Sequence, residues 1–126
     1  MKITVDQTTP QQLADLGLQA VQLLCAGDFS ALALQFGYAL AHDRDPASAI
    51  RDELALSLTE IGASALGPPP TTLPAVGYFK PNDTGLFAHV EQRIPTDGNG
   101  HVLLELIVSA KGADKHVVLE QISAAA

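Results

Sequence analysis

The sequence predicts an α+β fold, in which two to three N-terminal helices pack on one face of a three- to four-stranded antiparallel meander. Apolar residues recur at helical spacing over residues 10–62, whereas they alternate with polar residues over residues 75–123. Turn-forming residues interrupt the second region at 81–85, 96–100 and 111–114. A change from one period to the other is typical of a helical layer followed by consecutive strands.

The length of 126 residues is that of one domain. We therefore expect a single domain over residues 1–126, with a helical layer at 10–66 and a sheet at 75–123. Residues 67–74 contain four prolines, and such a stiff segment is predicted to connect the two layers. A proline-rich ligand for an aromatic groove is the alternative interpretation of this segment.

Capping residues define the first two helices. Pro10 suits the first position of a helix, and Thr9 before it can cap the free N–H groups. Gly27 is expected to end this helix, and Asp28 to cap the next one. Gly37 interrupts the apolar pattern of the second helix. The sequence leaves open whether the helix at 28–42 is broken there.

The third helix is expected to begin after Asp45, with Pro46 at its first position, and to end at Gly62 or Gly67. Residues 1–8 form either a short strand or a loose arm, and the sequence does not decide between them.

The register between strands 86–94 and 101–110 follows from the cost of burying charge. A two-residue turn would place His89 and Glu91 among the apolar side chains, at a cost of about several kcal/mol. A three-residue loop at 97–99 pairs Thr96 with Gly100 and avoids that cost. The residues that then face the helices are Ala88, Val90, Ile94, Val102, Leu104, Leu106 and Val108.

The next hairpin is expected to turn at residues 112–113 and to pair Ala110 with Lys115. With both registers, Glu91 lies opposite Glu105, and Glu105 lies opposite Glu120. Like charges directly opposite each other destabilise a sheet. His89 and Arg93 lie diagonal to Glu105, and the same face also holds Leu103, Ile107, Val118 and Ile122.

A face that mixes apolar side chains with carboxylates allows three interpretations. It can be a solvated surface whose acids are partly paired by Arg93. It can be a surface for a protein partner or for a second copy of the chain, and self-association would then be isologous. It can also be a site for a cation, a basic ligand or acid–base chemistry.

Composition excludes several classes of function. The chain has 14 acidic and 7 basic residues, a net charge of −7. Its basic residues are scattered singly, so neither nucleic acid nor an anionic membrane is an expected partner. No apolar run is long enough to span a bilayer. Cys25 is the only cysteine, which fits a cytoplasmic protein without a disulfide framework.

No cofactor and no metal is expected. His89 and Glu91 share one strand face, but two ligands do not make a zinc site. The sequence has no phosphate-binding loop, no nucleophile elbow and no zinc-protease motif. No catalytic residue is therefore assigned.

The order of elements, together with the stretch Ala26-Gly27-Asp28-Phe29-Ser30-Ala31-Leu32, resembles a cystatin-like roll of the superfamily named for nuclear transport factor two. The resemblance implies a cone-shaped pocket between helix and sheet, and often a dimer formed through the sheet. Members include isomerases, dehydratases, transport adaptors and association domains. The catalysts among them place Asp, His or Tyr inside the pocket, and the predicted inward face has no such residue.

We therefore expect a non-enzymatic protein-interaction or self-association module, either a homodimer or a module for another protein. The residues expected to bind the partner are Glu91, Arg93, Leu103, Glu105, Ile107, Val118, Glu120 and Ile122. The alternative is a small-ligand-binding or lyase/isomerase-type roll with a pocket between helix and sheet. Tyr78, His89 and Glu91 would then reach the mouth of that pocket.

Overall fold

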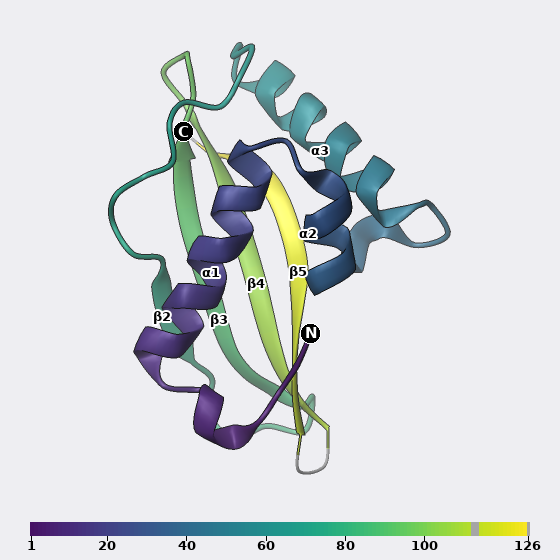
Figure 1. Cartoon of the computed structure of the whole chain (residues 1–126), viewed down its shortest axis with the longest axis vertical. Helices are drawn as coiled ribbons and strands as arrows, with labels where there is room; N and C mark the ends of the chain where they lie inside the picture. The colour runs from purple at the N-terminus through teal and green to yellow at the C-terminus, as the bar shows by residue number, and fades with distance from the viewer. Residues whose placement is uncertain (112–113, 126) are drawn as a thin grey trace.

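The fold was analysed in a computed structural model, which describes residues 1–111 and 114–125. In this part of the chain, three α-helices pack against a five-stranded antiparallel sheet, so the predicted α+β fold is confirmed (Figure 1). The helices are α1 (Pro10–Cys25), α2 (Phe29–Phe36) and α3 (Pro46–Glu60), with short 3-10 turns at Val5–Gln7 and Ala39–Ala41. The strands are β1 (Lys2–Ile3), β2 (Ala75–Tyr78), β3 (Leu86–Pro95), β4 (His101–Lys111) and β5 (Asp114–Ala125).

The predicted caps hold the helices. The Thr9 side chain accepts a hydrogen bond from the backbone N–H of Gln12, and the Asp45 side chain accepts one from that of Ser48. Gly37 resolves the question of the second helix. Its φ of 70° and ψ of −170° end α2 at Phe36, and this backbone conformation is essentially restricted to glycine.

The sheet has the order β1-β5-β4-β3-β2. The N-terminal segment joins it, because Lys2 and Ile3 pair with His116 and Lys115 of β5. Residues 2–3 are therefore a strand. The short β2 forms the other edge, next to β3.

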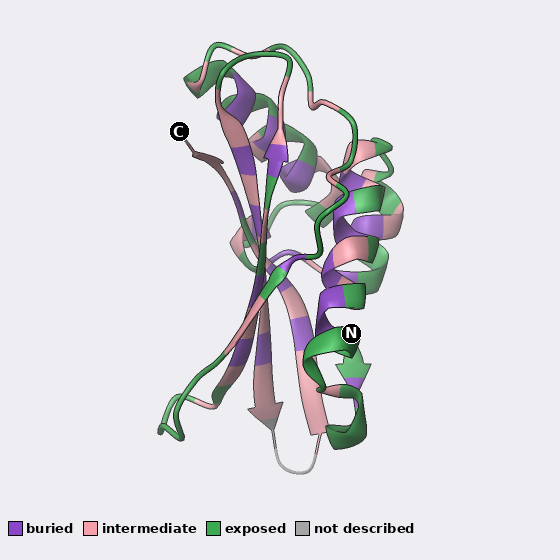
Figure 2. Ribbon diagram, turned by 90° about the vertical axis from the view of Figure 1, so that its left-hand side faces the viewer, coloured by how far each residue is buried: buried purple, intermediate pink, exposed green. Residues whose placement is uncertain are grey.

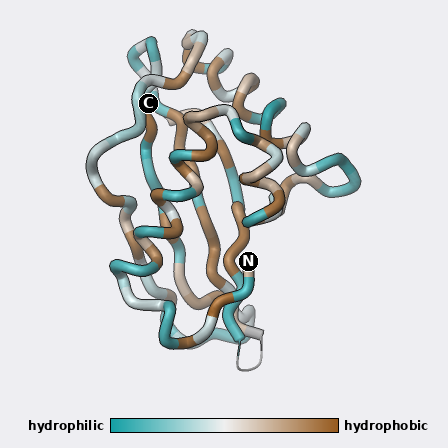
Figure 3. Tube along the Cα trace, in the orientation of Figure 1, coloured by the Kyte–Doolittle hydropathy of each residue, from teal (hydrophilic) through white to brown (hydrophobic). Residues whose placement is uncertain are grey.

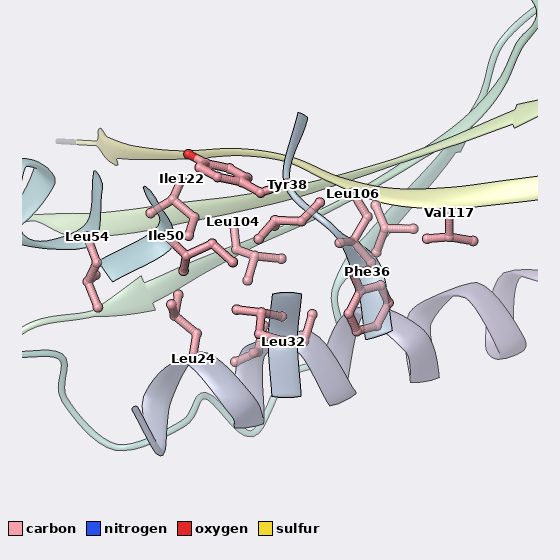
Figure 4. Close-up of a cluster of buried hydrophobic side chains, with 14 of the residues drawn as sticks. Leu24, Leu32, Phe36, Tyr38, Ile50, Leu54, Leu104, Leu106, Val117 and Ile122 are labelled. Atoms are coloured by element: carbon pink, nitrogen blue, oxygen red, sulfur yellow. The ribbon is translucent and has the colours of Figure 1, made fainter. Parts of the chain in front are cut away.

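All three helices pack on one face of the sheet, which we call the inner face. Figure 2 shows α1 lying along one side of the strands. The side chains between the layers are almost completely buried, and Figure 4 shows those of Leu104 and Leu106 facing Leu32 and Phe36 of α2. Figure 3 shows hydrophobic and hydrophilic residues alternating along the strands, and a hydrophilic loop before α3.

The predicted register between β3 and β4 is confirmed. Pro95 pairs with His101, and Glu91 pairs with Glu105. This is the register that follows from the predicted pairing of Thr96 with Gly100. The predicted inward residues of both strands are buried, with at most 1% of their surface exposed. Between β4 and β5, Ala110 pairs with Lys115 as expected. The predicted turn at 112–113 lies outside the described residues.

The register of β5 beyond Leu119 differs from the prediction. Leu106 pairs with Leu119, but Glu105 pairs with Gln121 instead of Glu120, so one extra residue of β5 forms a bulge. The prediction that Glu120 lies directly opposite Glu105 is wrong. The bulge also reverses the direction of the residues that follow it.

Ile122 consequently belongs to the core. It is 3% exposed and pairs with the buried Leu104. Figure 4 shows it beside Ile50 of α3 and Tyr38. Its predicted place on the second face is therefore wrong, because a bulge allows both Leu119 and Ile122 to face the helices.

Candidate functional site

The candidate site is the outer face of the sheet, on the side away from the helices. We define the outer-face patch as the predicted partner-binding residues without Ile122. The patch consists of Glu91 and Arg93 of β3, Leu103, Glu105 and Ile107 of β4, and Val118 and Glu120 of β5.

Three apolar side chains belong to the outer-face patch, with Leu103 on one side of Glu105 and the pair of Ile107 and Val118 on the other. Leu103, Ile107 and Val118 are half-buried, although the helices pack against the buried residues of the other face. Ile107 and Val118 lie directly opposite each other, at a separation that lets their side chains touch. A β-carbon on Gly37 would lie 4.0 Å from Val118, so the end of α2 reaches this edge of the patch.

Carboxylates form a row across the three strands. Glu91 lies opposite Glu105, and Glu120 occupies the bulge of β5 next to the residue that pairs with Glu105. Partial burial raises the pKa of Glu105, and the negative charges of Glu91 and Glu120 raise it further. His89 acts in the opposite direction. The row therefore carries unfavourable repulsion that the charges around Glu105 do not fully offset.

His89 is held in place by its neighbours on the outer face. It pairs with Gly77 of β2, and its ring lies so close to the α-carbon of Gly77 that a β-carbon there would overlap the imidazole. The ring also contacts that of Phe79, with 5.4 Å between the two centroids. A glycine within a strand indicates a close approach of this kind, a signal that the sequence analysis did not use.

A shallow depression of about 280 Å³ lies at the end of the carboxylate row nearest β2. Its lining consists of Leu73, Ala75, Glu91, Gln92, Arg93 and Leu103. Leu73 belongs to the proline-rich connector and is 52% exposed. Its contribution was not predicted, because the sequence does not show where the connector runs relative to the sheet.

The three side chains of the ligand-binding alternative do not come together. His89 and Glu91 lie on the outer face, whereas Tyr78 pairs with the buried Ala88 and lies on the inner side. The hydroxyl of Tyr78 donates a hydrogen bond to the backbone oxygen of Thr8 at 2.7 Å. The three side chains therefore cannot line the mouth of one pocket.

Other reactive groups are poorly placed for chemistry. Burial raises the pKa of the half-buried Cys25 thiol, which favours the less reactive protonated form. Within residues 1–111 and 114–125, no three His, Cys, Asp or Glu side chains are arranged to hold a metal ion. None of the described helices has both the length and the apolar character needed to cross a bilayer.

Comparisons of the chain with protein-family models, with curated proteins and with solved structures gave no significant match. The geometry of the outer face is therefore the basis of the functional argument.

Proposed function

We propose that the chain is a non-enzymatic protein-interaction module that docks through the outer-face patch. One observation carries the proposal. The half-buried Leu103, Ile107 and Val118 lie on both sides of the carboxylate row, on the face of the sheet away from the helices. A surface that combines apolar side chains with charged groups is typical of a docking site.

The architecture is compatible with an α+β roll, and we propose that the chain is related to the superfamily named for nuclear transport factor two. In that superfamily the sheet often forms a dimer, which supports the choice of the sheet face. The interior argues for docking rather than catalysis. The space between the helices and the sheet is filled by side chains such as Leu104, Leu106 and Leu119, each 0% exposed. A cytoplasmic location stays a prediction.

Site-specific photo-crosslinking tests this function. A photo-reactive amino acid at Ala75, beside the depression, should give a discrete protein adduct in cells that express the chain. The same amino acid at Leu56, exposed on α3, is the matched control and should not. Ile107→Asp should abolish the adduct, because it places a charge against Val118 in the apolar part of the patch. Far-UV circular dichroism and the melting temperature establish that each variant is folded.

Sedimentation velocity of the purified chain over a hundredfold range of concentration completes the test, because it detects self-association through the same face. Equal adducts from Ala75 and Leu56, or adducts that Ile107→Asp leaves intact, would refute docking through the patch.

A further inference from the structure

We propose that the occupant of the outer-face patch is a basic segment of another protein, presented as a helix laid across β3, β4 and β5. This inference rests on the proposed docking function and adds the chemical class of the partner. Two features of the patch carry it: the charge of the carboxylate row, and the spacing of its carboxylates between apolar side chains that lie on both sides of the row.

Charge complementarity selects a cationic partner. Glu91, Glu105 and Glu120 stand together on the outer face, and each of the other two carboxylates disfavours the charged form of Glu105. Lysine or arginine side chains would relieve this repulsion and would be attracted from a distance. Arg93 and His89 border the row on the same face, whereas His101, His116 and Lys2 lie farther from it along the strands.

The same charges argue against a second copy of the chain. An isologous dimer brings the same patch of two molecules together, so it would bring two carboxylate rows into one interface. Each copy also carries a net charge of −7, which slows the encounter.

The spacing of the row favours a helix over an extended segment. Neighbouring strands lie about 4.8 Å apart, so the row spans about 10 Å. Residues i and i+4 of a helix are about 5–6 Å apart, which matches one strand spacing. Alternate residues of an extended chain are about 6.7 Å apart and would drift out of step with the three carboxylates.

Apolar side chains lie on both sides of the row. Leu103 is two residues before Glu105 on β4, and Ile107 is two residues after it, so each lies about 6.7 Å away along the strand. Leu73 and Leu103 also line the depression beside Glu91. The aliphatic stem of a lysine can pack against these leucines while its ammonium group meets the carboxylate.

Calorimetric titration with synthetic peptides tests the inference. The probe is an 18-residue amphipathic helix with lysines at i, i+4 and i+7, flanked by leucines. Its controls are the same peptide with glutamates in place of the lysines, and a lysine peptide of the same composition in scrambled order. We expect the lysine helix to bind at least tenfold more tightly than either control, and more weakly at high salt.

Charge-matched variants distinguish recognition from general attraction. Glu91→Gln and Glu105→Gln should each weaken binding of the lysine helix about threefold, the size expected for a partly exposed ion pair. Asp43→Asn removes the same charge from the loop before α3 and should leave the affinity unchanged. If all three substitutions weaken binding equally, the attraction is that of the net charge and the inference is overturned.

Failure of the inference can be separated from failure of the docking function. Tight binding of the glutamate peptide that is lost in Ile107→Ser would keep the patch as a docking surface but overturn a basic occupant. Self-association that is lost in Ile107→Ser would also keep the patch as a docking surface and overturn the basic occupant, because the occupant would then be a second copy of the chain. If neither peptide binds, no copy associates and no adduct forms at Ala75, both proposals are wrong.

Discussion

Gly17 provides a sharp test of how closely α1 approaches the sheet. This buried residue lies near the middle of the helix, where alanine is normally preferred by about 1 kcal/mol. A β-carbon at this position would lie 2.6 Å from Cγ1 of Val90 and 3.0 Å from Cγ of Pro74. Favourable carbon–carbon contacts are about 3.5–4.0 Å, so one of the neighbours must move.

Val90 has little room to move. It is 1% exposed, it belongs to β3, and it pairs with Val76 on one side and Leu106 on the other. Its branched side chain also has restricted rotamers. Overpacking a rigid site costs about 1–3 kcal/mol. Part of this cost is offset by the higher helix propensity of alanine, about 1 kcal/mol. Gly17→Ala should therefore lower the free energy of unfolding by about 1 kcal/mol, or the melting temperature by about 4 °C.

Val90→Ala should reverse the sign of that effect. Without Cγ1 the new methyl group fills vacated space, so adding Gly17→Ala to Val90→Ala should raise the free energy of unfolding by about 1 kcal/mol. The coupling between the two sites is then about 2 kcal/mol. Urea unfolding followed by far-UV circular dichroism measures all four proteins. Comparison of Gln19→Ala with Gln19→Gly, on the exposed side of α1, measures the difference in helix propensity between alanine and glycine in this helix.

A stabilising Gly17→Ala in the natural background, or a coupling below about 0.5 kcal/mol, would show that the helix and the sheet are not in tight contact at this point.

Three further predictions concern the patch and the helix ends. Glu105→Gln should stabilise the fold by about 0.5 kcal/mol at neutral pH, because it removes repulsion from opposite carboxylates. Folding raises the pKa of Glu105 above the ordinary glutamate pKa of 4.5. The free energy of unfolding therefore falls as the pH rises above 4.5, because the folded state holds the proton more tightly than the unfolded state. Urea titrations at several pH values should show that Glu105→Gln loses this decline. Asp43→Asn is the control for net charge. Thr9→Ala should cost about 1 kcal/mol in thermal melts, since it removes the cap of α1, and a null effect would contradict the capping geometry. Gly37→Ala should cost about 1–3 kcal/mol in the same assay, because the backbone there has a positive φ, and an unchanged melting temperature would mean that α2 ends differently.

The register of β3 and β4 was predictable because one physical cost decided it. Turning Glu91 and His89 toward the helices would have buried charge, and only the three-residue loop avoids that. The first residues of α1 and α3 were equally predictable, since Thr9 and Asp45 each precede a proline at the first helical position. These features depend on residues close together in the sequence.

The bulge in β5 was missed, although the sequence contains a signal for it. Leu119 and Ile122 are three positions apart, and a regular strand cannot turn both toward the same face. Strict alternation was applied instead, and it placed Ile122 on the outer face. The course of the connector that carries Leu73 depends on contacts between distant segments, so no local pattern could reveal it.

The pairing of the N-terminal strand has a consequence for biosynthesis. The backbone N–H of Val117 donates a hydrogen bond to the Met1 oxygen at 2.7 Å, and Ile3 pairs with Lys115. Residues 1–3 are translated well before β5 and must therefore wait for that strand before they acquire their native neighbours. Until then Ile3, 5% exposed in the finished fold, has no completed sheet to cover it. Nascent chains of this protein are consequently vulnerable to aggregation and to proteases until translation has passed β5.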